Sequence, residues 1–364
     1  MKCQVKLREK SRNAWSEHRA FIAMERAELD DAGYRSLLYP MMLWTLIADG
    51  ATQRNFVLPK LRQRWPKELA RSTFFASKLY GVYLYGYGVN CYVVHESVGG
   101  GANLACTCIY LTLLDALEAG RPPPEELQFN LDNTTSENKC VTMFMFAGWL
   151  VLMGYVKRIR IFFLPKGHTH VIIDQVYGRI TKFIRSRSIY SMPELLDAIK
   201  EVLHRSKKVQ GRTVKQLHHL YDFDSMLDPF SAGLAGFASG EASGDGYHDF
   251  YISLNDADDP VPVVNVKKWG QTIDFVEEGP FELFKSASVE ALRRAKPQIA
   301  KIKGDSGWNR DEFYSNMRAA EQYFNLDEHR LEEVRKAWIR TLENTAAGES
   351  SLLNHNIIPF KVPQ

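Results

Sequence analysis

Acidic and imidazole side chains follow two segments whose residues alternate as they do in β-strands. Residues 127–131 alternate apolar and polar side chains, and Asp132 comes directly after them. Residues 158–163 alternate similarly, and His168 and His170 follow the break that ends this second segment. In an open α/β sheet, side chains that follow neighbouring strands converge outside the carboxyl ends of those strands. We therefore expect one site to form from these two strand ends.

Two kinds of chemistry suit these side chains. Carboxylate oxygens are the ligands that hard cations such as Mg²⁺ or Mn²⁺ prefer. His168 and His170 flank a single residue, so in an extended segment they point to one side and could bind a transition metal such as Zn²⁺. The structural alternative is that Thr169 caps the following helix while both histidines hydrogen-bond loop carbonyls. The sequence leaves both alternatives open.

A third strand end supplies another carboxylate. The apolar run 42–49 is expected to form a buried strand, and it ends on Asp49. The structural alternative for Asp49 is an Asp-Gly turn. For Asp132 it is an Asx-turn or a helix N-cap, which Asn133 could equally provide.

The expected elements alternate between strands and helices. In chain order they are a strand at 42–49, a hairpin at 79–94, a helix at 102–117, strands at 127–131 and 159–163 around a helix at 134–155, and helices near 193–205 and 213–220. The β-α-β unit is expected to be parallel. The fold class is therefore α/β, with a mixed sheet flanked by helices and a smaller C-terminal α+β region. This order resembles the wiring of a ribonuclease-H-like or retroviral-integrase-like core.

A more specific resemblance rests on short motifs. The motifs are ADGATQRNFVLPK (48–60), LQFNLDNTTSENK (127–139), FFLPKGHTHVIIDQVYGRI (162–180) and, more loosely, HDFYISL (248–254) with VNVKKW (264–269). Together they resemble one eukaryotic family, abundant in protists, of transposon-derived domains of unknown function. The resemblance implies a ribonuclease-H-like core and DNA as the partner.

The resemblance also implies roles for single residues. Asp49, Asp132 and Asp174 would be the catalytic carboxylates and would hold Mg²⁺ or Mn²⁺ for phosphodiester cleavage or strand transfer. Further metal contacts would come from His168 and His170. The supporting residues would be Asn133, Glu137, Asn138 and Thr169, although Glu137 could equally cap a helix.

The chain departs from the family's motifs at positions where acids are usual. Thr52 follows the Asp-Gly pair of the first motif, and Val171 and Ile172 follow the second histidine. An apolar side chain cannot replace a carboxylate as a metal ligand. A metal-dependent nuclease or transposase-like enzyme and a catalytically inactive module that binds DNA or protein therefore both stay open. A third function, a metal-dependent hydrolase of small phosphoesters, would require a closed pocket rather than an open basic groove.

Basic character is local, because the formal net charge is only +3 for 364 residues. Clustered Lys and Arg side chains provide most non-specific affinity for nucleic acid, while solvated surface is the structural alternative. Lys139 is expected either to face solvent or to contact a phosphate. The expected nucleic-acid contacts are Lys60, Arg62, Arg64, Lys139, Lys166 and Arg179.

Composition bounds the compartment and the domain organisation. Five cysteines and the absence of a secretory signal indicate an intracellular protein, and a DNA partner indicates the nucleus. The apolar run 141–156 is too short to span a bilayer, so no membrane role is expected. The sequence does not fix the oligomeric state. We expect an N-terminal helical extension (1–40), a ribonuclease-H-like core (41–205), a loop-rich region with a small β module (206–287) and a helical tail (288–364) whose aromatic residues pack together.

Overall fold

The protein was analysed in a computed structural model. The structure describes residues 42–51, 56–62, 69, 74–132, 134, 136–163, 171–206, 211–233, 247–268, 278–300 and 310–346. All statements below concern these residues.

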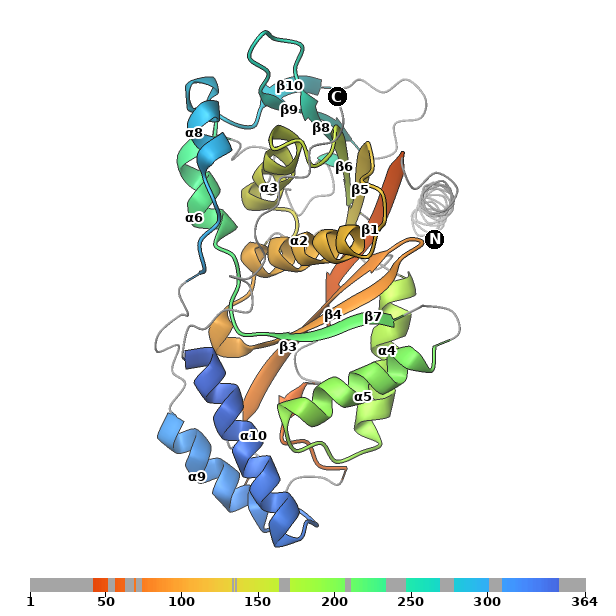
Figure 1. Cartoon of the computed structure of the whole chain (residues 1–364), viewed down its shortest axis with the longest axis vertical. Helices are drawn as coiled ribbons and strands as arrows, with labels where there is room; N and C mark the ends of the chain where they lie inside the picture. Colours follow the sequence, from red (N-terminus) through yellow and green to blue (C-terminus); the bar gives the residue numbers. More distant parts are fainter. Residues whose placement is uncertain are drawn as a thin grey trace, which may run out of the picture.

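Ten strands of the described chain form one mixed sheet (Figure 1). The strands are β1 (Leu43–Gly50), β2 (Val57–Leu58), β3 (Phe75–Leu84), β4 (Gly88–His95), β5 (Glu126–Leu131), β6 (Arg158–Phe163), β7 (Gly211–Leu217), β8 (Tyr247–Leu254), β9 (Pro262–Lys268) and β10 (Glu278–Glu282). Their order is β10-β9-β8-β6-β5-β1-β3-β4-β7, and β2 pairs with β3 off this path. The expected α/β class with a mixed sheet is confirmed.

Strand β1 separates two kinds of pairing. On one side it pairs antiparallel with β3, which pairs antiparallel with β4, so the tyrosine-rich hairpin expected at 79–94 is present. On the other side β1 is parallel to β5, and β5 is parallel to β6. The expected parallel β-α-β unit is therefore also confirmed. Strands β8, β9 and β10 extend the same sheet through antiparallel pairs beyond β6, so the β module expected within 206–287 continues the central sheet.

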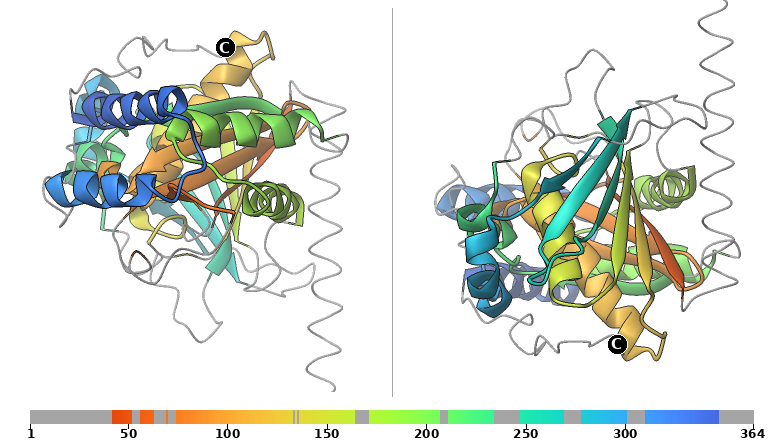
Figure 2. Two further views of the ribbon diagram at one scale, coloured as in Figure 1. Left: turned by 90° about the horizontal axis from the view of Figure 1, so that it is seen from below. Right: turned by 90° about the horizontal axis from the view of Figure 1, so that it is seen from above.

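Helices cover both faces of the sheet. The helices are α2 (Ala102–Glu118), α3 (Val141–Leu152), α4 (Val171–Arg185), α5 (Met192–His204), α6 (Phe223–Leu227), α8 (Val289–Arg294), α9 (Arg310–Glu321) and α10 (Glu328–Ala346). In Figure 2, α3 and α4 lie on opposite sides of the central strands. The core under α2 and α3 contains the alternate β5 residues Leu127, Phe129 and Leu131, as their period of two predicts. A second core lies under α4, α5, α9 and α10.

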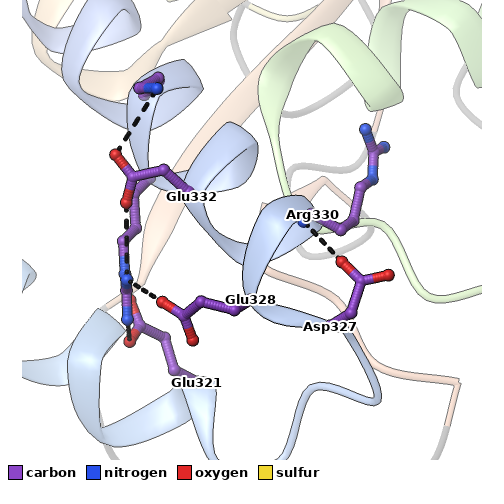
Figure 3. Close-up of polar contacts among 7 residues, drawn as sticks. Glu321, Asp327, Glu328, Arg330 and Glu332 are labelled. Carbon is purple, nitrogen blue, oxygen red and sulfur yellow. Dashed lines mark hydrogen bonds and ion pairs between the residues drawn. The ribbon is translucent and has the colours of Figure 1, made fainter.

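The helical tail packs onto the second core. Its aromatic side chains Phe313 and Trp338 are buried there, and the Trp338 indole donates a hydrogen bond to the Tyr190 carbonyl at 2.7 Å. The expected packed aromatic face is therefore present. Arg335 on α10 joins the two tail helices by contacting Glu321 on α9, and it also contacts Glu328 on its own helix. Figure 3 shows Glu321 and Glu328 among neighbouring charged residues.

Two expected helices differ in the structure. The helix expected at 134–155 begins at Val141, because the preceding residues form a tight turn in which the amides of Glu137, Asn138 and Lys139 all donate to the Thr134 carbonyl. The segment expected as a helix at 213–220 is strand β7, which pairs parallel with β4. Its tertiary pairing overrides the helical preference of the local sequence. No described helix has both the length and the apolar character needed to cross a membrane.

Two helical glycines provide a test of the packing. A Cβ on Gly148 in α3 would lie 2.7 Å from the Leu283 side chain and 3.0 Å from Phe284, whereas one on Gly178 in α4 would meet nothing within 4 Å. We expect Gly148→Ala to destabilise the protein by about 1–3 kcal/mol through overpacking. The matched variant Gly178→Ala should stabilise it by about 0.5–1 kcal/mol through helix propensity. Urea unfolding measures both, and equal effects of the two variants would contradict the packing of α3.

Candidate carboxylate site

Two aspartates lie side by side because two parallel strands end together. Ala48 of β1 and Leu131 of β5 are register partners, and each is followed by an aspartate, Asp49 or Asp132. Parallel strands lie about 4.8 Å apart. The core therefore brings both carboxylates to one edge of the sheet.

The Asp132 carboxylate is held by its own turn. One oxygen accepts from the Thr134 amide at 3.1 Å and from the Asn138 amide group at 2.6 Å, and the other accepts from the Thr134 hydroxyl. The buried Asn138 in turn accepts from the Tyr80 hydroxyl at 3.1 Å. The Asx-turn that the sequence left open is thus present, and Asp132 has a fixed orientation.

The surroundings of the Asp49 carboxylate disfavour its ionised form. Burial, together with the negative charges of Asp132, Asp174 and Glu137, raises its pKa to about 7, although a hydrogen bond from the Gly50 amide opposes the rise. That hydrogen bond is 2.8 Å long. Desolvation and like charges both disfavour an ionised carboxylate. Asp49 is therefore the electrostatic centre of a cluster of four acids.

Helix α4 contributes Asp174 to this cluster. Asp174 lies in the first turn of α4, and burial raises its pKa. Three residues later, the Tyr177 hydroxyl donates to the backbone carbonyl of Asp49. A Cβ on Gly81, which pairs with Asp49 across β1 and β3, would lie 2.8 Å from the Tyr177 hydroxyl oxygen. The glycine therefore permits the close approach that holds α4 against the site.

Glu137 is the acid with a cation nearby. Burial raises its pKa, the charge of Lys78 opposes this effect, and Asp132 adds to it. Its carboxylate lies 3.5 Å from the position that a Cβ on Gly50 would take. Lys78 also donates to the Gly99 carbonyl at 3.4 Å. The turn 134–140 thus contributes Glu137 as well as the partners of Asp132.

The donor set fits an oxygen-preferring cation better than an ion such as Zn²⁺, which favours nitrogen and sulfur ligands. All four acids offer carboxylate oxygens, which Mg²⁺ and Mn²⁺ prefer. Burial raises the pKa of Asp49 most, and the negative charge of the neighbouring acids, which a bound cation would offset, adds to the rise. Within the described residues, however, no three His, Cys, Asp or Glu side chains form a group that could hold a metal ion. Ligation would therefore require these side chains to move closer together.

The other expected site residues separate into two groups. Lys60, Arg62 and Arg179 have their contacts away from the acids. The backbone of Lys60 pairs with that of Ile189, which follows α4, and the Arg62 amide donates to the Ser188 hydroxyl. The Arg179 side chain donates to the Ser206 hydroxyl. Burial and the charge of Arg185 lower the pKa of Lys60. The expected residues Asn133, Arg64, Lys166, His168, Thr169 and His170 lie outside the described residues.

Lys139 does not face solvent, which was one of its two expected roles. Its relative exposure is 3%, and burial lowers its pKa to about 8.

Sequence analysis missed two tyrosines of the site. Tyr177 follows Asp174 at a spacing of three, so both face one side of α4, and this spacing was a usable signal. Tyr80 approaches the site because its backbone pairs with Gly50, and the register between β1 and β3 cannot be read from the chain.

The raised pKa of Asp49 predicts how stability depends on pH. Between its ordinary pKa of 3.8 and its folded value of about 7, the native chain keeps a proton that the unfolded chain has lost. The Asp49 contribution to the free energy of unfolding therefore falls as pH rises through this interval. In Asp49→Asn we expect the free energy of unfolding to decrease less as pH rises, because asparagine resembles the protonated acid. Urea unfolding at several pH values measures the slope.

The control is Asp197→Asn, since Asp197 is an exposed acid on α5. Its slope should match that of the unsubstituted protein. An unchanged slope in Asp49→Asn would contradict the electrostatic description of the cluster.

Comparison with known families identifies the larger part of the chain. A profile for the Domain of unknown function (DUF7869) matches residues 67–271, more than half of the 364 residues. The match includes Asp132, Glu137, Lys139 and Asp174, whereas Asp49 precedes it. No curated protein and no solved structure matches the chain. The chain belongs to the DUF7869 family of domains of unknown function.

Proposed function

We propose that this protein cleaves or transfers DNA phosphodiesters at the carboxylate site, with Mg²⁺ or Mn²⁺ as cofactor. The observation that carries the proposal is the parallel register of β1 and β5, which brings Asp49 beside Asp132; burial and the charges of Asp132, Asp174 and Glu137 also raise the pKa of Asp49. Perturbed acids from separate elements are typical of functional sites. A cluster made only of acids would gain most from divalent cations.

The strand order supports a ribonuclease-H-like core. An antiparallel hairpin, β3 and β4, lies on one side of β1, and the parallel strands β5 and β6 lie on the other. Helices α2 and α3 connect these strands, and α4 follows β6 with the third aspartate. This is the wiring that the motif resemblance implies. Descent from a transposase rests on that resemblance alone.

Each side chain has a role that follows from its surroundings. Asp49, Asp132 and Asp174 would hold the cations, which when bound stabilise charge on the phosphoryl group and lower the pKa of water. Asn138 and Thr134 orient Asp132 through hydrogen bonds, and Tyr80 orients Asn138. Tyr177 fixes the backbone of Asp49.

A second candidate is a catalytically inactive module that binds nucleic acid. It is favoured by the hydrogen bonds that already occupy both oxygens of Asp132, and by the lack of a ready metal-binding group in the described residues. A hollow on α4 and α5 supplies a basic surface for such binding and is lined by Arg179, Lys182, Phe183, Ser186, Val202, Arg205 and Ser206.

Mn²⁺ binding tests the cofactor. Carboxylates must lose their protons to bind a metal, so we expect Mn²⁺ to raise Tm more above the Asp49 pKa of about 7 than below it. At about one hundred times Kd the stabilisation should reach about 2.7 kcal/mol. Asp49→Asn and Asp174→Asn should lose it, while Asp197→Asn keeps it. An equal Mn²⁺ response in all three variants would mean that the acids do not form a cation site.

Nicking of supercoiled plasmid DNA tests the activity. We expect nicking by the full chain with Mn²⁺, and a reduction to the metal-free level in Asp132→Asn, because a ligand is lost. The second candidate predicts no nicking and a loss of DNA affinity in a double variant, Arg179→Ala with Lys182→Ala. That outcome, with catalysis absent under every metal tried, would replace the first proposal by the second.

A further inference from the structure

Among the residues that the structure describes, Lys139 is a buried cation without an anionic partner. Its relative exposure is 3%, and its ammonium lies 5.5 Å from the centroid of the Phe163 ring. Across the described chain, its side chain forms no hydrogen bond or ion pair. A buried charge is costly unless it is paired, so lysines at such positions usually have a partner. The cation–π contact compensates only in part.

The surroundings of Lys139 do not supply that partner. His248 hydrogen-bonds the backbone of Phe163, and burial together with the charge of Lys139 lowers its pKa to about 3, so it is neutral. Asp249, the next residue on β8, is held by Arg160 in a two-pronged pair at 2.9 and 2.8 Å. Asp249 is therefore already paired with Arg160 and is not the anion that Lys139 lacks. The pKa of Lys139, lowered to about 8 by burial alone, agrees with the lack of a nearby anion.

Lys139 is also fixed relative to the carboxylate site. Its amide donates to the Thr134 carbonyl at 3.0 Å, in the same turn that orients Asp132. Its ammonium lies over Phe163, the last residue of β6, while Asp132 follows β5 and Asp49 is the next-to-last residue of β1. Neighbouring strands are about 4.8 Å apart, so β6 lies roughly 10 Å from β1 along one edge. Lys139 is therefore beside the acids but separate from them.

We propose that Lys139 receives a phosphate group of the nucleic-acid strand, next to the phosphate that meets the carboxylates. This proposal rests on the function proposed above and deepens it by assigning a flanking-phosphate contact. A phosphodiester supplies the anion that the described protein lacks at this point. A lysine contacts phosphate as a point charge, which requires no fixed geometry.

Binding of a labelled single-stranded oligodeoxynucleotide, followed by fluorescence anisotropy at several salt concentrations, tests the proposal. Lys139→Met should weaken binding and reduce the slope of log K against log salt by about 0.7, the value for one phosphate contact on a single strand. Lys139→Arg, which keeps the charge, should retain most of the slope. The matched control is Lys157→Met, because Lys157 is exposed and pairs with Glu125 at 3.0 Å. It should change neither quantity.

Thermal unfolding separates this role from a structural one. Removal of an unpaired buried charge should leave Tm of Lys139→Met unchanged or higher, whereas a structural lysine would lower it. Wild-type affinity and slope in Lys139→Met, or a lower Tm, would overturn the proposal. Failure of the proposed carboxylate site would be detected separately, as a Mn²⁺ response in Asp49→Asn equal to that of the unsubstituted protein. The oligonucleotide assay would still report on Lys139.

Discussion

The carboxylate site depends on the register in which β1 pairs with β5. Strand β1 is paired on both sides, and its residues Leu46 and Ile47 face the two opposite cores. A slip of one residue would exchange these faces and expose each core to the wrong side chains. Hydrophobic burial therefore fixes the register, and the register places Asp49 next to Asp132 against their mutual repulsion.

Asp132 and Asp49 have different surroundings. Asp132 accepts hydrogen bonds from Thr134 and Asn138, which fix its orientation. Burial and the charges of three other acids outweigh the hydrogen bond from the Gly50 amide to Asp49, and its pKa rises to about 7. Carboxylates with a raised pKa recur in acid–base chemistry. A catalytically inactive protein with this fold would keep the raised pKa of Asp49, because the packing of the two cores does not depend on catalysis.

Local patterns predicted the elements around the site better than they predicted its contacts. The alternation in β5 and the acids after β1 and β5 were sufficient to predict neighbouring strand ends. The turn 134–140 was interpreted as helix because its polar residues are also good N-caps, although Thr134 closes a tight turn there. Strand β7 depends on pairing with β4, and the contact of Tyr80 depends on register with β1; neither is encoded locally. The roles assigned to His168 and His170 stay predictions.

The separation of Lys139 from the acids follows from the same edge. A lysine beside Asp132 would form an ion pair, and that pair would neutralise a carboxylate needed for a cation. Lys78 illustrates this effect, since its charge opposes the rise in the pKa of Glu137. At the end of β6, Lys139 stays outside the hydrogen bonds of Asp132, while the turn they share keeps its position fixed. Under the proposed function, a phosphodiester strand along this edge would contact the acids at the ends of β1 and β5 through bound cations, and Lys139 at the end of β6 directly. The acids and Lys139 can contact one nucleic-acid strand because the sheet keeps them from pairing with each other.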